Sequence, residues 1–398
     1  MNPNYKLAIF GGTPAFSENL HVGRPNIGDR QSLLNRIADM LDRRWLTNNG
    51  PYVRELEHQI SKLIGVKHCI CMCNGTVALE IACRAVGMKG EVIVPSFTFV
   101  ATAHALQWQE ITPVFCDVDP LTHCIDPAKL ERHITPRTSG ILAVHTWGHP
   151  CDVEALSAIA SRHGIKLVYD AAHAFACSHN GRMIGSFGDA EVFSFHATKF
   201  FNTLEGGAIA TNNDDLAAKI RLMKNFGFRG TDNVIYIGTN GKMNEASAAM
   251  GLTNLESLPE FIAVNLDNYT RYRRGLAHIP GIRVLEYPEH EKCNYQYIIV
   301  EVDEYRTGVS RDVLVRILQA ENILARRYFY PACHRMEPYR SYFPHAGMLL
   351  PETELLTKRV LSLPTGTGVT GGNIETICQI IQMVVSRGAE ISARLPLE

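Results

Sequence analysis

Residues 193–211 read FSFHATKFFNTLEGGAIAT. A run typical of a β-strand comes first, and the diglycine Gly206–Gly207 leads into a second such run, with Lys199 between them among aromatic residues. A lysine is rarely placed among apolar neighbours without a partner or a task. A loop lysine that reaches solvent is the plainer alternative, which the flanking phenylalanines disfavour. The stretch therefore predicts two strands and marks Lys199 as a candidate functional residue.

The same alternation of strands and helices extends outward over about residues 68–212. The β-rich runs are HCICMC, EVIVP, PVFCDV, GILAVHT, KLVYDAA, EVFSFH and GGAIAT, and helix-like stretches such as VALEIACRAVG and DVEALSAIASRHG lie between them. Near-continuous apolar runs separated by helices indicate a mostly parallel sheet that is covered on both faces. The sequence therefore predicts an α/β fold around a mostly parallel seven-stranded sheet, with ligands at the carboxyl ends of its strands.

The character of the chain changes after about residue 212, where helical segments dominate and a strand-like YQYIIVEV follows. A chain of 398 residues is longer than one hydrophobic core usually absorbs. We expect an N-terminal arm (1–30), a large domain (31–255) and a smaller α+β C-terminal domain (256–398). A long helix near residues 244–278 would lead into the small domain, and residues 31–65 would be helical.

The bulk composition excludes several classes of protein. A net charge of -1 and a pI near 7.0 give no sign of electrostatic capture of nucleic acid or of an anionic membrane. No apolar run reaches membrane-spanning length, and the N-terminus lacks a signal-peptide pattern, which predicts a cytoplasmic protein. The eleven cysteines are scattered; Cys69, Cys71 and Cys73 alternate along one predicted strand, where packing is favoured over a metal site. No metal is predicted.

Two stretches place polar residues after predicted strands. CNGTVALE puts Asn74, Gly75 and Thr76 at the start of a helix, where free N–H groups meet an anion such as phosphate, although ordinary helix capping explains them as well. VYDAAHA puts Asp170 at the end of an apolar strand, three residues before His173. A buried carboxylate needs a donor or a cation, and capping of the next helix is the alternative.

Two further stretches complete a set. FSFHATK holds Ser194 and Lys199, and VPSFTFVAT ends a strand with Phe97 and Phe99, which either stack on a flat ligand or belong to the core. Pyridoxal phosphate needs a lysine for its Schiff base and a carboxylate for its ring nitrogen, together with a phosphate cup and a flat surface. The order of these stretches along one α/β domain supplies each part once.

The sequence resembles the pyridoxal-phosphate sugar aminotransferases of the DegT/DnrJ/EryC1/StrS family, within the aspartate-aminotransferase fold (fold type I). The resemblance covers nearly the whole chain, through LTNNGPYVRELE, NGTVALE, VPSFTFVAT, DVDPLTHCID, VHTWGHPCDVEAL, VYDAAHAFA, FSFHATKFFNTLEGGAI, GTNGKMNEASAAMGL, YFYPACH and LSLPTGTGVT. So many stretches in the same order are a strong signal, unlike any one of them alone.

The resemblance implies a role for individual residues. Lys199 would form the Schiff base with pyridoxal 5′-phosphate, Asp170 would pair with the ring nitrogen, and His173 would contact the ring hydroxyl. Phe99 would stack on the ring. The phosphate cup would be formed by Gly75, Thr76 and Ser194.

Asn240 matches an asparagine that reaches the neighbouring subunit's phosphate, which implies a homodimer with shared active sites. The surrounding TNGK, residues 239–242, departs from the Tyr-Asn-(Tyr or Phe)-Arg pattern of many relatives. Because lysine lacks the bidentate fork of arginine, the substrate-binding chemistry near this position differs from theirs.

The activity implied is transfer of an amino group from an amino acid, typically glutamate, to a keto group of a nucleotide-linked deoxysugar. Candidates for the sugar-nucleotide pocket, for which packing is an equal alternative, are Thr47, Asn49, Trp147, His149, Tyr330 and His334. The competing functions are an aminotransferase for a cyclitol or other keto-alcohol, a sugar dehydratase with the same cofactor and a non-catalytic sensor on the same fold. Lys199 argues against the dehydratase, since such relatives replace the lysine, and no DNA-binding appendage supports a sensor.

Overall fold

A seven-stranded sheet lies at the centre of the larger part of the molecule in the computed structural model, which describes residues 5–395. Its strand order is β2-β10-β9-β6-β5-β3-β4, and only β10 runs antiparallel to its neighbours. The strands are β2 (His68–Met72), β3 (Glu91–Pro95), β4 (Thr112–Cys116), β5 (Thr138–Val144), β6 (Lys166–Asp170), β9 (Ala190–Ser194) and β10 (Gly207–Thr211). The seven predicted runs are these seven strands, so the predicted mostly parallel sheet is confirmed.

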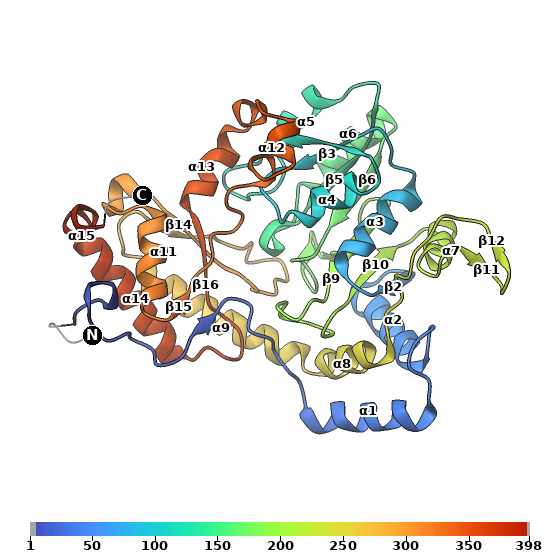
Figure 1. Ribbon diagram of the computed structural model, residues 1–398, viewed down its shortest axis with the longest axis horizontal. Coiled ribbons are helices and arrows are strands. Elements are labelled where there is room, and N and C mark those ends of the chain that lie inside the picture. The colour runs from blue at the N-terminus through green and yellow to red at the C-terminus, as the bar shows by residue number, and fades with distance from the viewer. Residues whose placement is uncertain (1–4, 396–398) are drawn as a thin grey trace.

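Helices cover both faces of this sheet (Figure 1). In β2, Ile70 and Met72 join the apolar core beneath α3, whereas Cys69 and Cys71 join the core beneath α2, as the period of two in a strand requires. The helices of this part are α1 (Arg30–Arg43), α2 (Pro51–Ile64), α3 (Gly75–Val86), α4 (Ala101–Gln107), α5 (Pro127–Leu130), α6 (Val153–His163), α7 (Asp214–Met223) and α8 (Glu245–Glu256).

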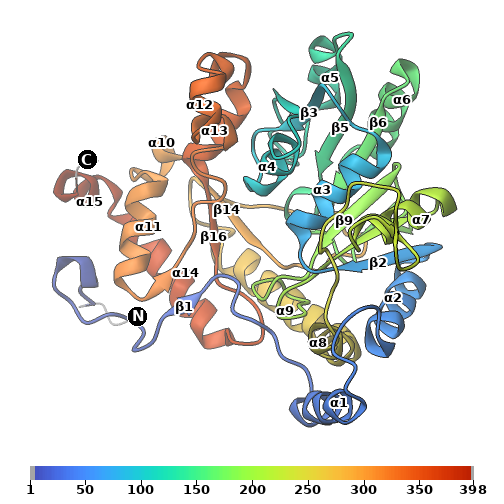
Figure 2. The same ribbon diagram turned by 45° about the vertical axis from the view of Figure 1, so that its right-hand side comes forward.

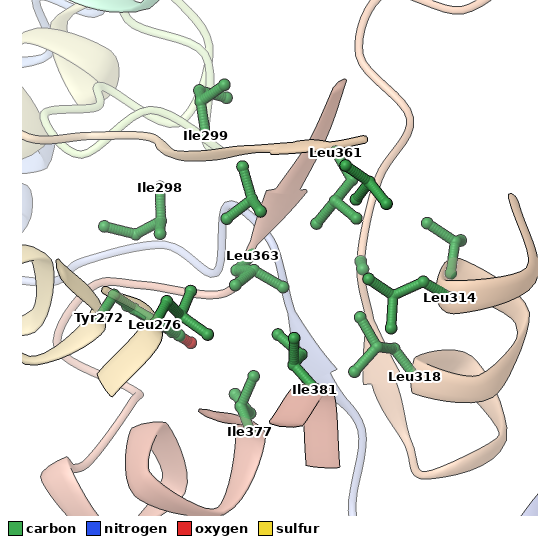
Figure 3. Close-up of a cluster of buried hydrophobic side chains, with 14 of the residues drawn as sticks. Tyr272, Leu276, Ile298, Ile299, Leu314, Leu318, Leu361, Leu363, Ile377 and Ile381 are labelled. Atoms are coloured by element: carbon green, nitrogen blue, oxygen red, sulfur yellow. The ribbon is translucent and has the colours of Figure 1, made fainter. Parts of the chain in front are cut away.

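The smaller part is α+β, as predicted, and lies beside the large sheet in both views (Figures 1 and 2). Its antiparallel sheet has the order β13-β14-β16, and α9, α11 and α14 pack their apolar sides around a core that includes Leu314, Leu363 and Ile381 (Figure 3). Its main elements are α9 (Leu258–Leu276), β13 (Ile282–Val284), β14 (Ile298–Val302), α10 (Glu304–Thr307), α11 (Arg311–Ala320), α12 (Tyr339–Tyr342), α13 (Pro351–Arg359), β16 (Val360–Leu363), α14 (Gly371–Ser386) and α15 (Gly388–Arg394).

The remaining strands are pairs of two residues: β1 (Leu20–His21) with β15 (Ile323–Leu324), β7 (Ser178–His179) with β8 (Arg182–Met183), and β11 (Phe228–Arg229) with β12 (Asn233–Val234). Through the first pair, the N-terminal segment attaches to the smaller part, where buried Glu321 accepts hydrogen bonds from the N–H groups of Ala8 and Ala15 at 2.7 and 2.8 Å. The domain limits drawn from the sequence stay predictions.

Two long helical predictions are interrupted in the structure. The helix expected near residues 244–278 is divided into α8 and α9 at Ser257, where φ is -94° and ψ is 2°; Pro259, which has no N–H, follows in the first turn of α9. The helical region expected over 31–65 is divided by a loop in which Asn48 and Asn49 adopt φ values of 61° and 59°. Asparagine tolerates this left-handed conformation better than most residues.

The cysteine cluster differs from the expectation. Cys69 and Cys71 are buried in β2, but Cys73 lies beyond the end of the strand, where its N–H donates to the Gly241 carbonyl at 2.8 Å. The three thiols therefore do not share one strand. Residues 5–395 hold no group of three or more histidine, cysteine or acidic side chains placed to bind a metal ion. Within the same range, no helix is long and apolar enough to span a membrane.

Candidate active site

A cavity of about 620 Å³ opens at the carboxyl ends of β6 and β9, where ligands of parallel sheets bind. Asp170 is the last residue of β6, and Ser194 is the last residue of β9. The predicted site residues that line this cavity together are Gly75, Thr76, Phe99, Asp170, His173, Ser194 and Lys199.

The first turn of α3 forms one end of the cavity. Asn74 caps the helix, because its Oδ1 accepts a hydrogen bond from the N–H of Val77 at 2.8 Å. The N–H groups of Gly75 and Thr76 precede the first intrahelical bond and have no partner among residues 5–395. A Cβ at Gly75 would lie 3.0 Å from the Cβ of Ser194, so glycine lets the helix approach that strand end. The free donors and the helix dipole make a cup that suits a phosphate.

Asp170 is the buried carboxylate of the cavity. The Thr102 hydroxyl donates to its Oδ2 at 2.8 Å and the N–H of Ala172 donates to its Oδ1 at 3.1 Å. Burial raises the pKa of Asp170, and these two hydrogen bonds together with the charge of Lys199 oppose the rise. A carboxylate held in this way at a cavity wall suits a cationic partner such as a protonated ring nitrogen.

Lys199 lines the same cavity as Asp170, and the charges of the two side chains attract each other. Burial lowers the pKa of Lys199 to about 8, against the attraction of Asp170. The Nζ atom of Lys199 donates to the Tyr297 hydroxyl at 3.2 Å. An amine whose pKa is lowered to this range is a competent nucleophile and base near neutral pH.

His173 has a defined tautomer. The N–H of Trp147 donates to its Nδ1 at 3.2 Å, so the ring proton resides on Nε2. The imidazole is stacked with the rings of Trp147 and Phe329, with interplanar angles of 7° and 1°. Burial and the charge of Lys199 hold the pKa of His173 well below its usual range. The neutral ring is therefore a hydrogen-bond donor through Nε2.

These residues fit pyridoxal phosphate. Unpartnered N–H and hydroxyl donors are present for a phosphate, Asp170 for the ring nitrogen and His173 for an anionic ring oxygen. Lys199 supplies the amine, and Phe99, which is 57% exposed, presents an aromatic face within the lining. The roles assigned to the single residues remain predictions.

Four predicted sugar-pocket residues lie outside this lining. Trp147 is fully buried behind His173, and both ring nitrogens of His334 are engaged, with Ser96 and with Glu354 at 2.7 Å each. The carbonyl of His149 accepts from the Cys124 thiol at 3.4 Å. Tyr330 is half-exposed and lines a second hollow beside the cavity. Trp147 is thus part of the buried core and His334 is held by hydrogen bonds within the protein, whereas Tyr330 lines a neighbouring hollow.

Three other predicted residues lie away from the cavity of their own chain. Thr47 and Asn49 are exposed in the loop between α1 and α2. Asn240 is exposed and forms an isolated antiparallel bridge with Asn225. Asn49 lines a separate hollow of about 230 Å³ with Arg221 and Lys242, and none of the three residues reaches the cavity that holds Lys199.

The sequence reasoning missed a wall supplied by the smaller part. Tyr297, immediately before β14, contacts Lys199, and Arg326, Tyr328 and Phe329 also line the cavity. The signal was present in CNYQYIIVEV, where polar residues precede an apolar strand. Asn294 donates to the His173 carbonyl at 2.8 Å, and the Gln296 side chain accepts from the N–H of Phe200 at 3.0 Å. Segment 294–297 therefore holds the loops that carry His173 and Lys199.

A lysine and a carboxylate at the strand ends of such a sheet, with a phosphate cup, define an enzyme of the fold type I class that uses pyridoxal phosphate. The profile of the DegT/DnrJ/EryC1/StrS aminotransferase family matches residues 28–382. The chain belongs to this family of pyridoxal-phosphate-dependent aminotransferases. The resemblance found in the sequence is thereby confirmed.

Individual relatives are similar over almost their full length. The dTDP-4-amino-4,6-dideoxy-D-glucose transaminase of Shigella dysenteriae is 37% identical over 92% of this chain and 99% of its own. The GDP-perosamine synthase of Caulobacter vibrioides is 35% identical over 88% of this chain and 94% of its own. The solved structure of DesI in the presence of its TDP-sugar product is 49% identical, with a TM-score of 0.94 and coverage of 98% of both chains.

Proposed function

We propose that this enzyme transfers an amino group from an amino acid, with glutamate as the first candidate, to the keto group of a nucleotide-linked deoxysugar. The observation that carries the proposal is one cavity that holds Lys199, with its pKa lowered to about 8, and buried Asp170. The names of the relatives supply the substrate class: one is a transaminase of a dTDP-linked sugar that bears its amine at C4. The corresponding acceptor is a dTDP-linked 4-keto-6-deoxyhexose.

The residues of the cavity divide the work. Pyridoxal phosphate, when bound, supplies an electron sink that makes the proton on the substrate carbon acidic. Asp170 would keep a positive charge at the ring nitrogen favourable, and His173 would donate from Nε2 to the ring oxygen. In the first half of the reaction, Lys199 as the free amine would take the proton from Cα of the donor and pass it to the cofactor carbon. In the second half it would take a proton back from that carbon and deliver it to the sugar carbon that held the carbonyl oxygen. Tyr297, whose hydroxyl accepts from Nζ of Lys199 at 3.2 Å, would orient this amine.

The test is an assay with glutamate and a panel of keto-sugar nucleotides, read by mass spectrometry of the sugar product. We expect the dTDP-linked 4-keto-6-deoxyhexose to gain an amine in place of its carbonyl oxygen, and Lys199→Ala to abolish both the product and the visible absorption band of the bound cofactor. A protein that takes up no pyridoxal phosphate would overturn the proposal. If only a keto-cyclitol were aminated, the enzyme would instead be a cyclitol aminotransferase.

We further propose a homodimer whose active sites contain residues of both chains. Thr47, Asn49 and Asn240 are exposed and lie outside the cavity of their own chain, which fits residues that complete a neighbour's site. Exposed apolar side chains near Asn240 include Ile237 and Val234, which are 75% and 55% exposed and suit an interface. Sedimentation or light scattering that finds only monomers at assay concentration would contradict this proposal.

We place the enzyme in the cytoplasm. The eleven scattered cysteines, all of them free thiols, support a reducing compartment. Fractionation of cells that express a tagged chain tests this placement.

A further inference from the structure

A second hollow of about 350 Å³ adjoins the active-site cavity. The two share a boundary, formed by Thr98, Phe99, Arg326, Tyr328 and Phe329. The two spaces therefore form one groove that leads away from Lys199, past Arg326, toward Tyr330.

Arg326 is anchored by its backbone at this boundary. Its N–H donates to the Ser362 carbonyl at 3.1 Å, and its carbonyl accepts from the N–H of Ser362 at 2.8 Å, which ties it to β16. Its guanidinium makes no ion pair or hydrogen bond within residues 5–395. Both Arg326 and Lys199 oppose the burial-driven rise in the pKa of Tyr328, so the two cations lie around the same hydroxyl.

The other charged groups of the groove are already engaged. Lys199 and Asp170 belong to the cofactor site, and His196 contacts Glu205 at 3.3 Å. Arg327, in the second hollow, is paired with Asp312 at 3.0 Å and lies 4.5 Å from the ring centre of Tyr330. Among the described residues, Arg326 is the guanidinium of this lining that has no ion-pair partner.

The proposed reaction brings two anionic groups into the groove in turn. The amino donor carries a carboxylate beside the carbon that loses the proton, and the nucleotide sugar carries a diphosphate at the far side of the sugar ring. The planar fork of an arginine matches the oxygens of either group.

We propose that Arg326 binds the substrate oxyanion, the chemistry shared by the donor carboxylate and the nucleotide diphosphate, and so positions each substrate against Lys199. The inference rests on the proposed function. It predicts that the donor, the sugar nucleotide or both lose affinity when the guanidinium is removed.

Two binding measurements on the cofactor-loaded enzyme distinguish the sources. In the first, the absorbance change on mixing with glutamate gives the affinity for the donor without any sugar. In the second, calorimetry with deoxythymidine diphosphate gives the affinity for the diphosphate without turnover. Arg326→Gln removes the charge, Arg326→Lys keeps the charge without the fork, and Arg316→Gln, an exposed arginine of α11 outside both linings, controls for net charge. Thermal unfolding checks that each variant is folded.

We expect Arg326→Gln to weaken binding about tenfold or more in at least one measurement, and Arg326→Lys to restore part of it, whereas Arg316→Gln behaves as wild type. A loss with glutamate alone assigns Arg326 to the carboxylate, and a loss with deoxythymidine diphosphate alone assigns it to the diphosphate. Wild-type affinity of Arg326→Gln in both measurements would overturn the inference. If the wild type aminates no keto-sugar nucleotide, the proposed function fails. The glutamate measurement then still decides whether Arg326 binds the carboxylate of the amino donor.

Discussion

Lys199 is the residue on which the chemistry depends, and its surroundings work against its positive charge. Burial lowers the pKa from its ordinary value of 10.5 to about 8, although Asp170 pulls the other way. In the cofactor-free protein, burial of the charged amine therefore destabilises the folded state at this position, and such perturbed pKa values are common at functional sites.

A prediction on pH follows from this pKa. Below about pH 8 the lysine is charged in the folded and unfolded states, so the folded state bears the full cost of burying the charge. We expect Lys199→Met to raise the melting temperature of the cofactor-free protein at pH 7. The advantage should shrink between about pH 8 and 10.5, where the folded lysine is neutral and the unfolded one still charged. Calorimetry across this range measures it, and an advantage that grows with pH would contradict the assignment.

Tyr297 should stabilise the charged form of Lys199, because Nζ donates to its hydroxyl at 3.2 Å. Tyr297→Phe should lower the pH midpoint for capture of pyridoxal phosphate by the cofactor-free protein by about one pH unit. The capture rate is followed by absorbance. Tyr295→Phe, two residues away and outside the cavity lining, is the matched control and should leave the midpoint unchanged.

Asp170→Asn tests the carboxylate. Asparagine keeps the acceptor for the Ala172 N–H but removes the charge that favours a cationic ring nitrogen. We expect turnover to fall by about 100-fold or more, and the melting temperature of the cofactor-free protein to change little. Steady-state kinetics and thermal unfolding measure the two effects, and wild-type turnover would remove Asp170 from the mechanism.

At the scale of single elements, the phosphate cup depends on how closely β10 approaches α3. A Cβ at Gly207 would lie 2.8 Å from the carbonyl carbon of Asn74 and from the nitrogen of Gly75. Gly207→Ala should force β10 and the start of α3 apart, because the added methyl group overpacks this contact. We expect a lower melting temperature and cofactor binding weakened about tenfold or more. Fluorescence titration of the cofactor-free protein with pyridoxal phosphate measures the affinity.

Gly372→Ala is the matched control. A Cβ at this position of α14 meets only the Thr370 hydroxyl at 3.9 Å, and the helix favours alanine over glycine. We expect unchanged cofactor affinity and equal or slightly greater stability. A cofactor affinity of Gly207→Ala equal to that of this control would refute the importance of the close approach.

The elements also show what a sequence pattern can and cannot reveal. The seven strands were predictable because each is a nearly unbroken apolar run between helices, and Asp170 and Ser194 were predictable as site residues because they end such runs. The predicted helix over 244–278 is broken at Ser257, although the apolar pattern continues across it. The break at Asn48 had a signal in the sequence, because residues 47–51 read TNNGP, which is typical of a loop. Tyr297 and Arg326 were missed because only tertiary packing brings the smaller part against the large sheet.

At the scale of the whole molecule, the exposed position of Asn240 gives the proposed dimer a direct test. Lys199→Ala and Asn240→Ala homodimers should each be inactive. After equal amounts of the two variants exchange chains, about half of the dimers are heterodimers, and one of the two sites in each heterodimer holds both intact residues. The mixture should therefore recover up to about a quarter of the wild-type activity. Activity after mixing and chain exchange measures the recovery. Exchange without any recovery, shown by mass spectrometry of labelled dimers, would argue against shared sites.

Segment 294–297 holds the loops of His173 and Lys199, yet it is far from them along the chain. During synthesis, β6, which carries Asp170, and the loop after β9, which carries Lys199, leave the ribosome well before this segment does. All seven strands of the large sheet are therefore available before β14 emerges, and the wall of the cavity that contains Tyr297 is added only when β14 docks. Capture of pyridoxal phosphate would then mark a late step of biogenesis and bind only chains that have assembled both parts.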